Sequence, residues 1–129
     1  MAGTAFSLVN PYGVPHPWVM GAQVLSDALV GAAGGLAGRW LLHAEGEAPL
    51  GARSRTALLV GAGIALTSLY DLLTNTAQGI AYGSIPAALA LAVVPSLQHI
   101  ASNAAIFAIV GNLAFPWLAR HPAVVRHAA

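Results

Sequence analysis

Charged side chains are scarce in this sequence. Asp, Glu, Lys and Arg make up 7% of its 129 residues, against roughly 25% in an average soluble domain, and none of the basic residues is Lys. A soluble domain of this size needs charge on its surface to stay dispersed in water. The scarcity of charge therefore excludes an ordinary soluble globular protein.

Other absences exclude several functional classes. The chain has no cysteine, which rules out disulfides, thiolate metal sites and a cysteine nucleophile but leaves the redox compartment open. Its net charge of +1 provides no basic stripe for nucleic acid, so no nucleic-acid partner is expected. The HExxH, GxSxG and Walker A motifs are also missing, so nothing supports a metalloprotease, an esterase or an ATPase. We expect a protein that is not an enzyme and has no metal or cofactor.

Apolar residues, in contrast, make up 57% of the chain. Asp27 is the only charge before Arg39, and Asp71 is the only charge between Arg55 and Arg120. A helix that crosses a bilayer needs about 20 mostly apolar residues, so the first stretch accommodates one such helix and the second at least two. We predict an all-α integral membrane protein with about three transmembrane helices.

Proline and glycine divide these stretches into segments. Prolines prevent a continuous helix in the first 17 residues, and Gly83-Ser84-Ile85-Pro86 marks a turn. Pro95 divides a stretch too long for one simple span into a short Pro-broken helix and the last span, at about 96–118. The chain 1–129 is then a single membrane domain with an initial segment (1–17), a span (18–42), a link (43–55), a second span (56–82), a broken helix and span (86–120) and a tail (121–129).

All the arginines lie on one side of the predicted membrane. They flank or occupy the link and follow the last span (Arg39, Arg53, Arg55, Arg120 and Arg126). Positively charged loops stay preferentially in the cytoplasm. We therefore predict a multi-pass protein of the cell membrane whose link and C-terminus are cytoplasmic, with the initial segment and the 83–86 turn on the outer side.

Each predicted span carries polar side chains, which cost free energy in lipid. An isolated Asn, Gln or Ser in a span is typically an interhelical hydrogen bond, worth less than about 1 kcal/mol. Asp71 and His99 are ionisable and cost more, which favours a functional role for both. For Asp27 the two interpretations stay open.

Polar side chains from all three spans are expected at similar depth. Counted at about 1.5 Å per residue from the arginine next to each span, Gln23, Asp71 and Asn103 lie roughly 24–26 Å from the cytoplasmic side. Asn75 and His99 then lie about one turn further out. This pattern predicts either a polar pocket that opens to the outside or a polar clasp between helices.

The small and aromatic residues of the first span have simpler explanations. The span contains two overlapping GxxxG patterns (Gly31, Gly34, Gly35 and Gly38). They allow close helix packing, and a surface for a partner subunit is the alternative. Trp18 lies at the start of the span, where tryptophan commonly anchors a helix at the headgroup level.

Three segments of the chain carry motifs that occur together in a known family. They are Asn10–Gly13 with His16–Gln23 and Leu36–Arg39, then Tyr70–Asn75, and then Pro95–Asn103. The first resembles the Gly-Pro-Trp…Gln entry to the fourth helix in the substrate-binding S components of energy-coupling factor (ECF) vitamin transporters. The second is similar to the acid-plus-asparagine motif of their fifth helix, and the third to the Pro…His…Asn segment that opens their sixth.

The resemblance implies a small six-helix membrane protein that captures a micronutrient on the outer side. Such a protein delivers it together with a shared transmembrane coupling subunit and two ATPases. The chain corresponds to helices four to six, and the family's first three helices, with the small-residue motif that docks the coupling subunit, are not in it. We therefore expect the C-terminal half of an S component, from a truncated or mis-started reading frame, and poor binding to the coupling module.

The predicted function is a solute-binding subunit for a small, polar, vitamin-like ligand. The residues expected to contact this ligand are Asp71, Asn75, His99 and Asn103. Gln23 and Trp18 are expected to help close the outer side. Two alternatives remain: a small structural or oligomeric membrane protein held together by the polar layer, and a proton- or ion-conducting subunit that uses Asp71 and His99.

Overall fold

The computed structural model describes residues 15–47 and 51–120. The described chain forms α2 (Pro17–Glu47), α3 (Ala52–Tyr82), α4 (Ile85–Ile106), a π-helical turn η1 (Phe107–Gly111) and α5 (Asn112–Arg120), and these residues contain no strand. Most of the predicted initial segment (1–17), the part of the link at 48–50 and the tail (121–129) lie outside the described residues.

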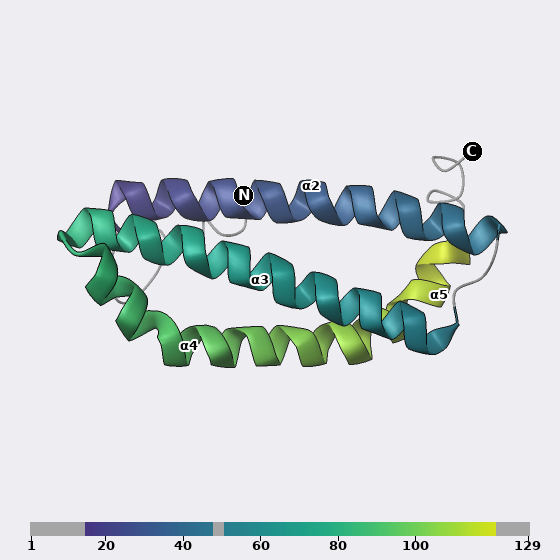
Figure 1. The fold of residues 1–129 in the computed structure, drawn as a ribbon. Coiled ribbons are helices and arrows are strands. Elements are labelled where there is room, and N and C mark those ends of the chain that lie inside the picture. Colours follow the sequence, from purple (N-terminus) through teal and green to yellow (C-terminus); the bar gives the residue numbers. More distant parts are fainter. Residues whose placement is uncertain (1–14, 48–50, 121–129) are drawn as a thin grey trace.

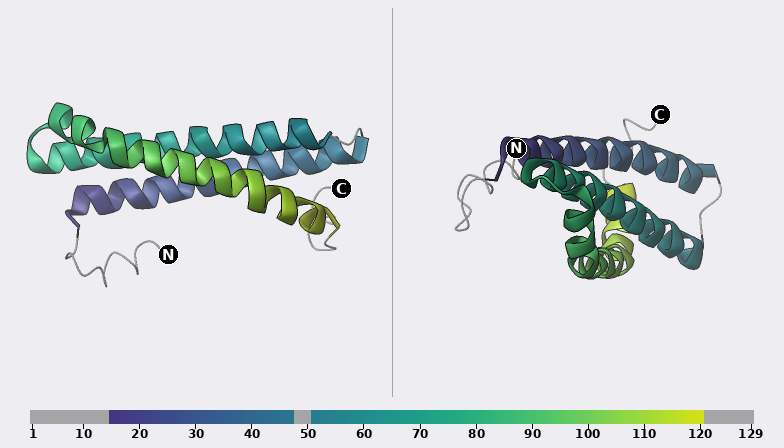
Figure 2. Two further views of the ribbon diagram at one scale, coloured as in Figure 1. Left: turned by 90° about the horizontal axis from the view of Figure 1, so that it is seen from below. Right: turned by 60° about the vertical axis from the view of Figure 1, so that its left-hand side comes forward.

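Three long helices run side by side, and α3 lies between the other two (Figure 1). α3 packs against both α2 and α4, and consecutive helices run in opposite directions. α4 crosses the other two at an angle when the molecule is seen from below (Figure 2). At the end where α2 finishes and α3 begins, α5 turns away from the line of α4 and crosses α3 (Figure 1).

The distribution of exposed and buried residues is the reverse of that in a water-soluble protein. Large apolar side chains are exposed along every long helix, as in Leu36 at 68% and Leu91 at 80%, while Ser26 and Thr67 are buried at 1% and 5%. Three helical stretches, Pro17–Gly38, Ala52–Tyr82 and Ile85–Trp117, are long and apolar enough to cross a membrane. The predicted all-α membrane fold with three spanning helices is confirmed.

Two helix ends differ from the predicted ones. α2 continues to Glu47, beyond the expected end at residue 42, and α3 begins at Ala52, so that Arg53 and Arg55 lie in a helix rather than in a link. A helix does not need to end where the lipid ends, because water also tolerates a helical backbone. The first strong helix-breaking signal after residue 42 is Pro49, which disfavours helical geometry in the residue before it.

The predicted turn between the second and third spans is confirmed. Gly83 ends α3 in the left-handed conformation, with φ of 87°, which glycine adopts without strain. Ser84 caps α4 by accepting a hydrogen bond from the Ala87 amide at 3.3 Å, and Pro86 occupies the first turn, where a missing N–H costs nothing. The turn is tight, because a Cβ at Gly79 would lie 2.5 Å from the Cα of Ile85.

Pro95 bends the third span without ending its helical hydrogen bonding. α4 is helical from Ile85 to Ile106 with Pro95 inside it, and its axis changes direction after its first turns (Figure 1). Proline lacks the N–H that would bond the carbonyl of Leu91, and its ring crowds that carbonyl. The expected short helix before the last span is therefore the first limb of a bent helix.

The π-helical turn at Phe107–Gly111 is absent from the prediction, and it is followed by Asn112 and Pro116 in α5. The Asn112 side-chain nitrogen Nδ2 donates to the Ala108 carbonyl within this turn, at 2.8 Å. Pro116 has no N–H to offer the Asn112 carbonyl, so it weakens regular helical bonding just after the turn. Such single π-turns are frequent at functional positions.

We predict that Gly79→Ala destabilises the protein by about 1–3 kcal/mol, because the new methyl group overlaps the backbone of Ile85. Gly61→Ala is the matched control, since it lies on the same helix with no atom within 4 Å of its Cβ. Both substitutions raise helix propensity equally, so their difference isolates the clash. Unfolding of the purified protein in detergent measures both, and equal stabilities would contradict the tight turn.

Candidate functional site

A cavity of about 300 Å³ lies between the three long helices. We name it the central cavity. Its polar lining consists of Asp27 from α2, Thr67 and Tyr70 from α3, and His99 and Asn103 from α4. Val30, Leu66, Gly63 and Phe107 complete the wall. An ionisable lining of this kind is costly inside a membrane-spanning bundle and marks a candidate binding site.

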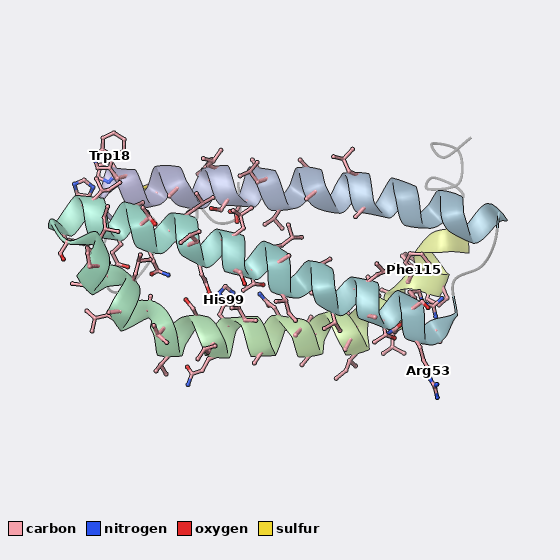
Figure 3. The ribbon with its side chains drawn as sticks, viewed as in Figure 1. Trp18, Arg53, His99 and Phe115 are labelled. Carbon is pink, nitrogen blue, oxygen red and sulfur yellow. The ribbon has the colours of Figure 1, made fainter. Side chains whose placement is uncertain are left out.

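His99 and Asp71 form a pair that joins α4 to α3. The His99 Nδ1 and Asp71 Oδ1 atoms lie 2.9 Å apart, and the side chains are 44% and 13% exposed. The Tyr70 ring meets the His99 ring edge to face, with centroids 6.0 Å apart. His99 lies about midway along the gap between α3 and α4 (Figure 3). An ionised carboxylate can only accept hydrogen bonds. A neutral His99 imidazole paired with Asp71 therefore carries its proton on Nδ1, and its Nε2 is left as a hydrogen-bond acceptor.

Asp71 faces a different cavity from the one that His99 lines. Asp71 lines a cavity of about 210 Å³ between α3 and α4, together with Ser68, Asn75 and Ser96. We name it the side cavity. The second carboxylate oxygen, Oδ2, is buried and has no hydrogen-bond partner among the described residues. Asp71 thus contacts the central cavity only through His99.

Asn103 pairs with a residue that the sequence analysis did not select. Its Nδ2 donates to the Thr67 hydroxyl at 2.8 Å, and Thr67 is 5% exposed. Asn103 therefore lies level with Thr67, one turn from Asp71 towards the basic end, and the predicted match in depth between Asp71 and Asn103 is wrong. The partner of Asp71 is His99.

The depth of Asn103 was counted from Arg120 and was misplaced, because the last residues of the predicted third span do not continue in the direction of α4. Asn112 lies level with Thr56, to which its Nδ2 donates at 2.7 Å, and the Arg55 Nε donates to its Oδ1 at 3.3 Å. The nine residues from Asn112 to Arg120 then cross the bundle in α5 (Figure 1). They add residues to the count without adding equivalent depth.

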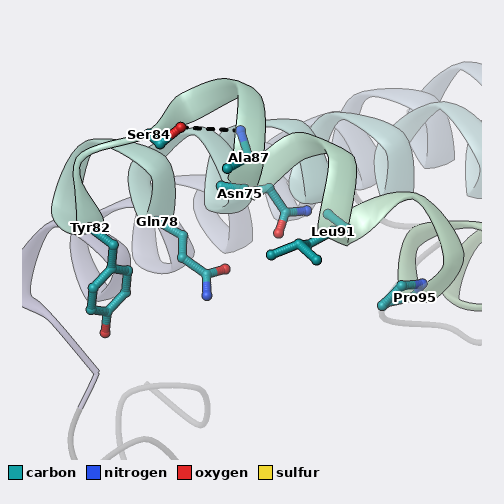
Figure 4. A pocket seen from close by; sticks show the side chains of 9 residues that line it. Asn75, Gln78, Tyr82, Ser84, Ala87, Leu91 and Pro95 are labelled. Carbon is teal, nitrogen blue, oxygen red and sulfur yellow. Dashed lines mark hydrogen bonds between the residues drawn. The ribbon is translucent and has the colours of Figure 1, made fainter.

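A third cavity, larger than the other two, lies at the end of the bundle that holds the α3–α4 turn. This outer cavity, of about 530 Å³, opens where the first limb of α4 bends away from α3. Asn75, Gln78 and Tyr82 reach it from α3, and Leu91 and Pro95 line it from α4 (Figure 4). Asn75 belongs to both the outer and the side cavity.

The two remaining predicted residues line none of these three cavities. Trp18 is 65% exposed, and its backbone N–H donates to Nδ1 of His16 at 3.3 Å. It lies at the opposite end of the bundle from Arg53 (Figure 3), which suits an aromatic anchor at a membrane surface. Gln23 is half-buried and interacts with neighbouring residues.

Sequence reasoning missed two groups of residues. Thr67 lies four residues before Asp71, so helical spacing alone places it on the same face. The cluster at the other end consists of Arg55, Thr56, Asn112 and Phe115, with the Arg55 guanidinium 5.4 Å from the centre of the Phe115 ring. Only the tertiary contact between α3 and α5 brings this cluster together.

We predict a favourable coupling of about 0.6 kcal/mol, and at most about 1.7 kcal/mol, between Thr67 and Asn103. The measurement is a double-mutant cycle of Thr67→Val and Asn103→Ala, followed by unfolding in detergent. The Ser102 hydroxyl donates to the His99 carbonyl of its own helix, so Thr67→Val with Ser102→Ala is the control cycle and should be additive. Additivity in the first cycle as well would mean that the two side chains do not hold α3 and α4 together.

The comparisons with known proteins add no second line of evidence for this site. Its interpretation depends on the contacts among α2, α3 and α4 described above. No protein-family model, no curated protein and no solved structure shows a significant match to this chain.

Proposed function

We propose that this chain is a membrane-embedded solute-binding subunit of the ECF S-component type, which captures a small, polar, vitamin-like molecule. The observation that carries the proposal is the central cavity, whose five polar side chains come from all three spanning helices. Small residues and a few interhelical hydrogen bonds are enough for three helices to pack, whereas this lining also includes an aspartate and a histidine, which cost more in a membrane.

The energetic cost of this lining supports a function beyond packing. An aspartate near the middle of a spanning helix costs about 2.5–3.5 kcal/mol on insertion scales. The three helices carry two such residues, Asp27 and Asp71, as well as His99. Asn103 and Thr67 by themselves would be enough for an interhelical hydrogen bond.

The lining also indicates what kind of molecule it suits. Nε2 of His99 accepts a hydrogen bond, the Asp27 carboxylate accepts from an N–H or O–H group, and the Tyr70 hydroxyl donates or accepts. The volume of about 300 Å³ is at the lower end of small-molecule sites. A small heterocycle with several N–H or O–H donors fits both the size and the chemistry. Asp71 then acts as a positioning residue that orients His99.

Energy for uptake would come from other subunits. The chain contains no lysine, and a P-loop requires one. We therefore propose a coupling transmembrane subunit and ATPases as partners, as in the family that the three motifs resemble.

A structural clasp is the second candidate. The observation that favours it is that polar groups of α3 and α4 already bond one another, through Asp71 with His99 and Thr67 with Asn103. In that case the polar layer would stabilise the bundle and bind nothing. Asp27 weighs against this candidate, because it lies on α2 and is exposed towards the central cavity.

We predict that a small molecule co-purifies with the protein and is lost, at least about tenfold, from His99→Ala and from Asp27→Asn. A tenfold loss corresponds to about 1.4 kcal/mol, within the range for one buried polar contact. Mass spectrometry of the extracted protein measures occupancy. Ser102→Ala is the control, since Ser102 lies on the same helix as His99 but lines none of the three cavities.

The melting temperature of the ligand-free protein separates the two candidates. A solute-binding role predicts that Asp27→Asn leaves it unchanged or raises it, because a charge is removed from the membrane. Lower stability of the ligand-free variants with no small molecule in any preparation would favour the structural clasp.

We also propose that the basic end of the bundle faces the cytoplasm. Single cysteines at Ser54 and Pro86, both exposed and at opposite ends, should react differently with an impermeant maleimide in intact cells. We expect labelling at position 86 and none at position 54 until the membrane is permeabilised. The reverse pattern would invert the proposed orientation.

A further inference from the structure

The carboxylate of Asp27 lines the central cavity without a positive charge to balance it. Asp27 is exposed, and it has no hydrogen bond or ion pair with another described residue. It lies near the middle of the stretch Pro17–Gly38, which is long and apolar enough to cross a membrane. An ionised group at such a depth costs free energy, and an opposite charge close to it offsets that cost.

The described arginines are too far from the cavity to supply this charge. Arg39 lies 12 residues from Asp27 on α2, and Arg55 lies 12 residues from Thr67 on α3. At 1.5 Å per residue each separation is about 18 Å along the helix. A long basic side chain near the end of a span extends towards water rather than into the membrane. No arginine is among the residues that line the cavity.

The neighbouring pair of His99 and Asp71 does not supply the charge either. The two side chains bond each other at 2.9 Å, so a protonated His99 only neutralises Asp71. If His99 is neutral, Asp71 adds a second negative charge behind the cavity wall. In both states the charge of Asp27 remains. The electrostatic environment of the central cavity therefore favours a positively charged ligand and disfavours an anion.

The polar lining consists mainly of hydrogen-bond acceptors. The Asp27 carboxylate only accepts, and a neutral His99 paired through Nδ1 accepts at Nε2. Asn103 donates to Thr67 through Nδ2, at 2.8 Å, which leaves its Oδ1 as an acceptor. The Tyr70 hydroxyl can also accept. A ligand with several N–H donors matches this lining.

Two aromatic rings complete a lining that suits a cation. Tyr70 and Phe107 both line the cavity, and Asp27 lies close enough to Tyr70 for the two groups to interact electrostatically. Phe107 approaches α3 where Gly63 leaves room, since a Cβ at Gly63 would lie 2.9 Å from Cδ2 of the Phe107 ring. A cation within about 6 Å of an aromatic ring is attracted to the ring face. The carboxylate and the rings thus favour the same kind of ligand.

We propose that the central cavity binds a small organic monocation, a protonated amine or amidine on a planar ring, with its charged group at Asp27. The inference rests on the solute-binding function proposed above and specifies the charge of the solute. One positive charge neutralises Asp27, and a planar amidinium can donate two parallel N–H groups to a carboxylate. The volume of about 300 Å³ restricts the ligand to a compact molecule.

The test compares three probes of nearly the same shape and different charge. Benzamidinium is positive, benzamide is neutral and benzoate is negative. Their binding to the washed full chain in detergent at pH 8, where an ordinary histidine is neutral, is measured by titration calorimetry and by the shift in thermal unfolding. We expect saturable binding of one benzamidinium per chain, binding of benzamide at least about tenfold weaker, and no binding of benzoate.

Substitutions of Asp27 locate the charge. Asp27→Asn should lower the affinity for benzamidinium at least about tenfold, or about 1.4 kcal/mol, and leave the affinity for benzamide unchanged. Asp27→Glu keeps the charge and should keep the preference for benzamidinium. Ser102→Ala, outside the three cavities, should bind the probes as the unmodified chain does. If Asp27→Asn does not fold, Phe107→Leu still tests the site, because loss of the ring should weaken benzamidinium about threefold more than benzamide.

Three results would overturn the cation proposal: benzamide or benzoate binding as tightly as benzamidinium, an undiminished preference for benzamidinium in Asp27→Asn, or binding of none of the probes. The solute-binding proposal is tested separately by co-purification. A neutral or anionic molecule that co-purifies with the chain and is lost from His99→Ala would overturn the cation proposal and leave solute binding supported.

Discussion

The inability of lipid to form hydrogen bonds is the constraint on which the structure depends. The backbone groups of a spanning helix must bond within the protein, and a polar side chain left without a partner there costs free energy. α3 carries most of these groups, and it is also the helix that contacts both of the others. Thr74 bonds the Tyr70 carbonyl of its own helix, whereas Thr67 and Asp71 bond residues of α4. The central position of α3 thus agrees with the number of its polar side chains that need hydrogen-bond partners.

The spanning helices and the turn between the last two were predictable from the sequence, because their signals are local. Apolar length defines a span, and Gly83, Ser84 and Pro86 specify the turn through their own backbone preferences. The pairing of polar residues was not predictable. Counting from Arg120 placed Asn103 level with Asp71 rather than Thr67, because the count included α5, which crosses the bundle and contacts α3 through Asn112 and Phe115. Such contacts connect residues more than fifty positions apart and leave no local pattern.

The structure also divides a set of residues that spacing had grouped together. Helical periodicity places Asp71 and Asn75 on one stripe, and His99 and Asn103 on another, which suggested one pocket. In the structure His99 and Asn103 line the central cavity, and Asp71 and Asn75 line the side cavity. The Asp71–His99 bond lies in the wall between them. A change in the charge of Asp71 or His99 therefore alters the electrostatic environment of both cavities.

The π-helical turn also changes the direction in which later residues face. Asn103 and Asn112 are nine residues apart, and at about 100° per residue a regular helix would direct them to opposite sides. The wider turn at Phe107–Gly111 reduces the total rotation about the helix axis by roughly that of one residue, about 100°. Both asparagines consequently bond α3, one near mid-span and one at its first turn. The π-helical turn thus accommodates one extra residue: deletion of a single residue there would restore a regular helix and keep the later residues facing α3, whereas a regular helix of unchanged length would rotate them away.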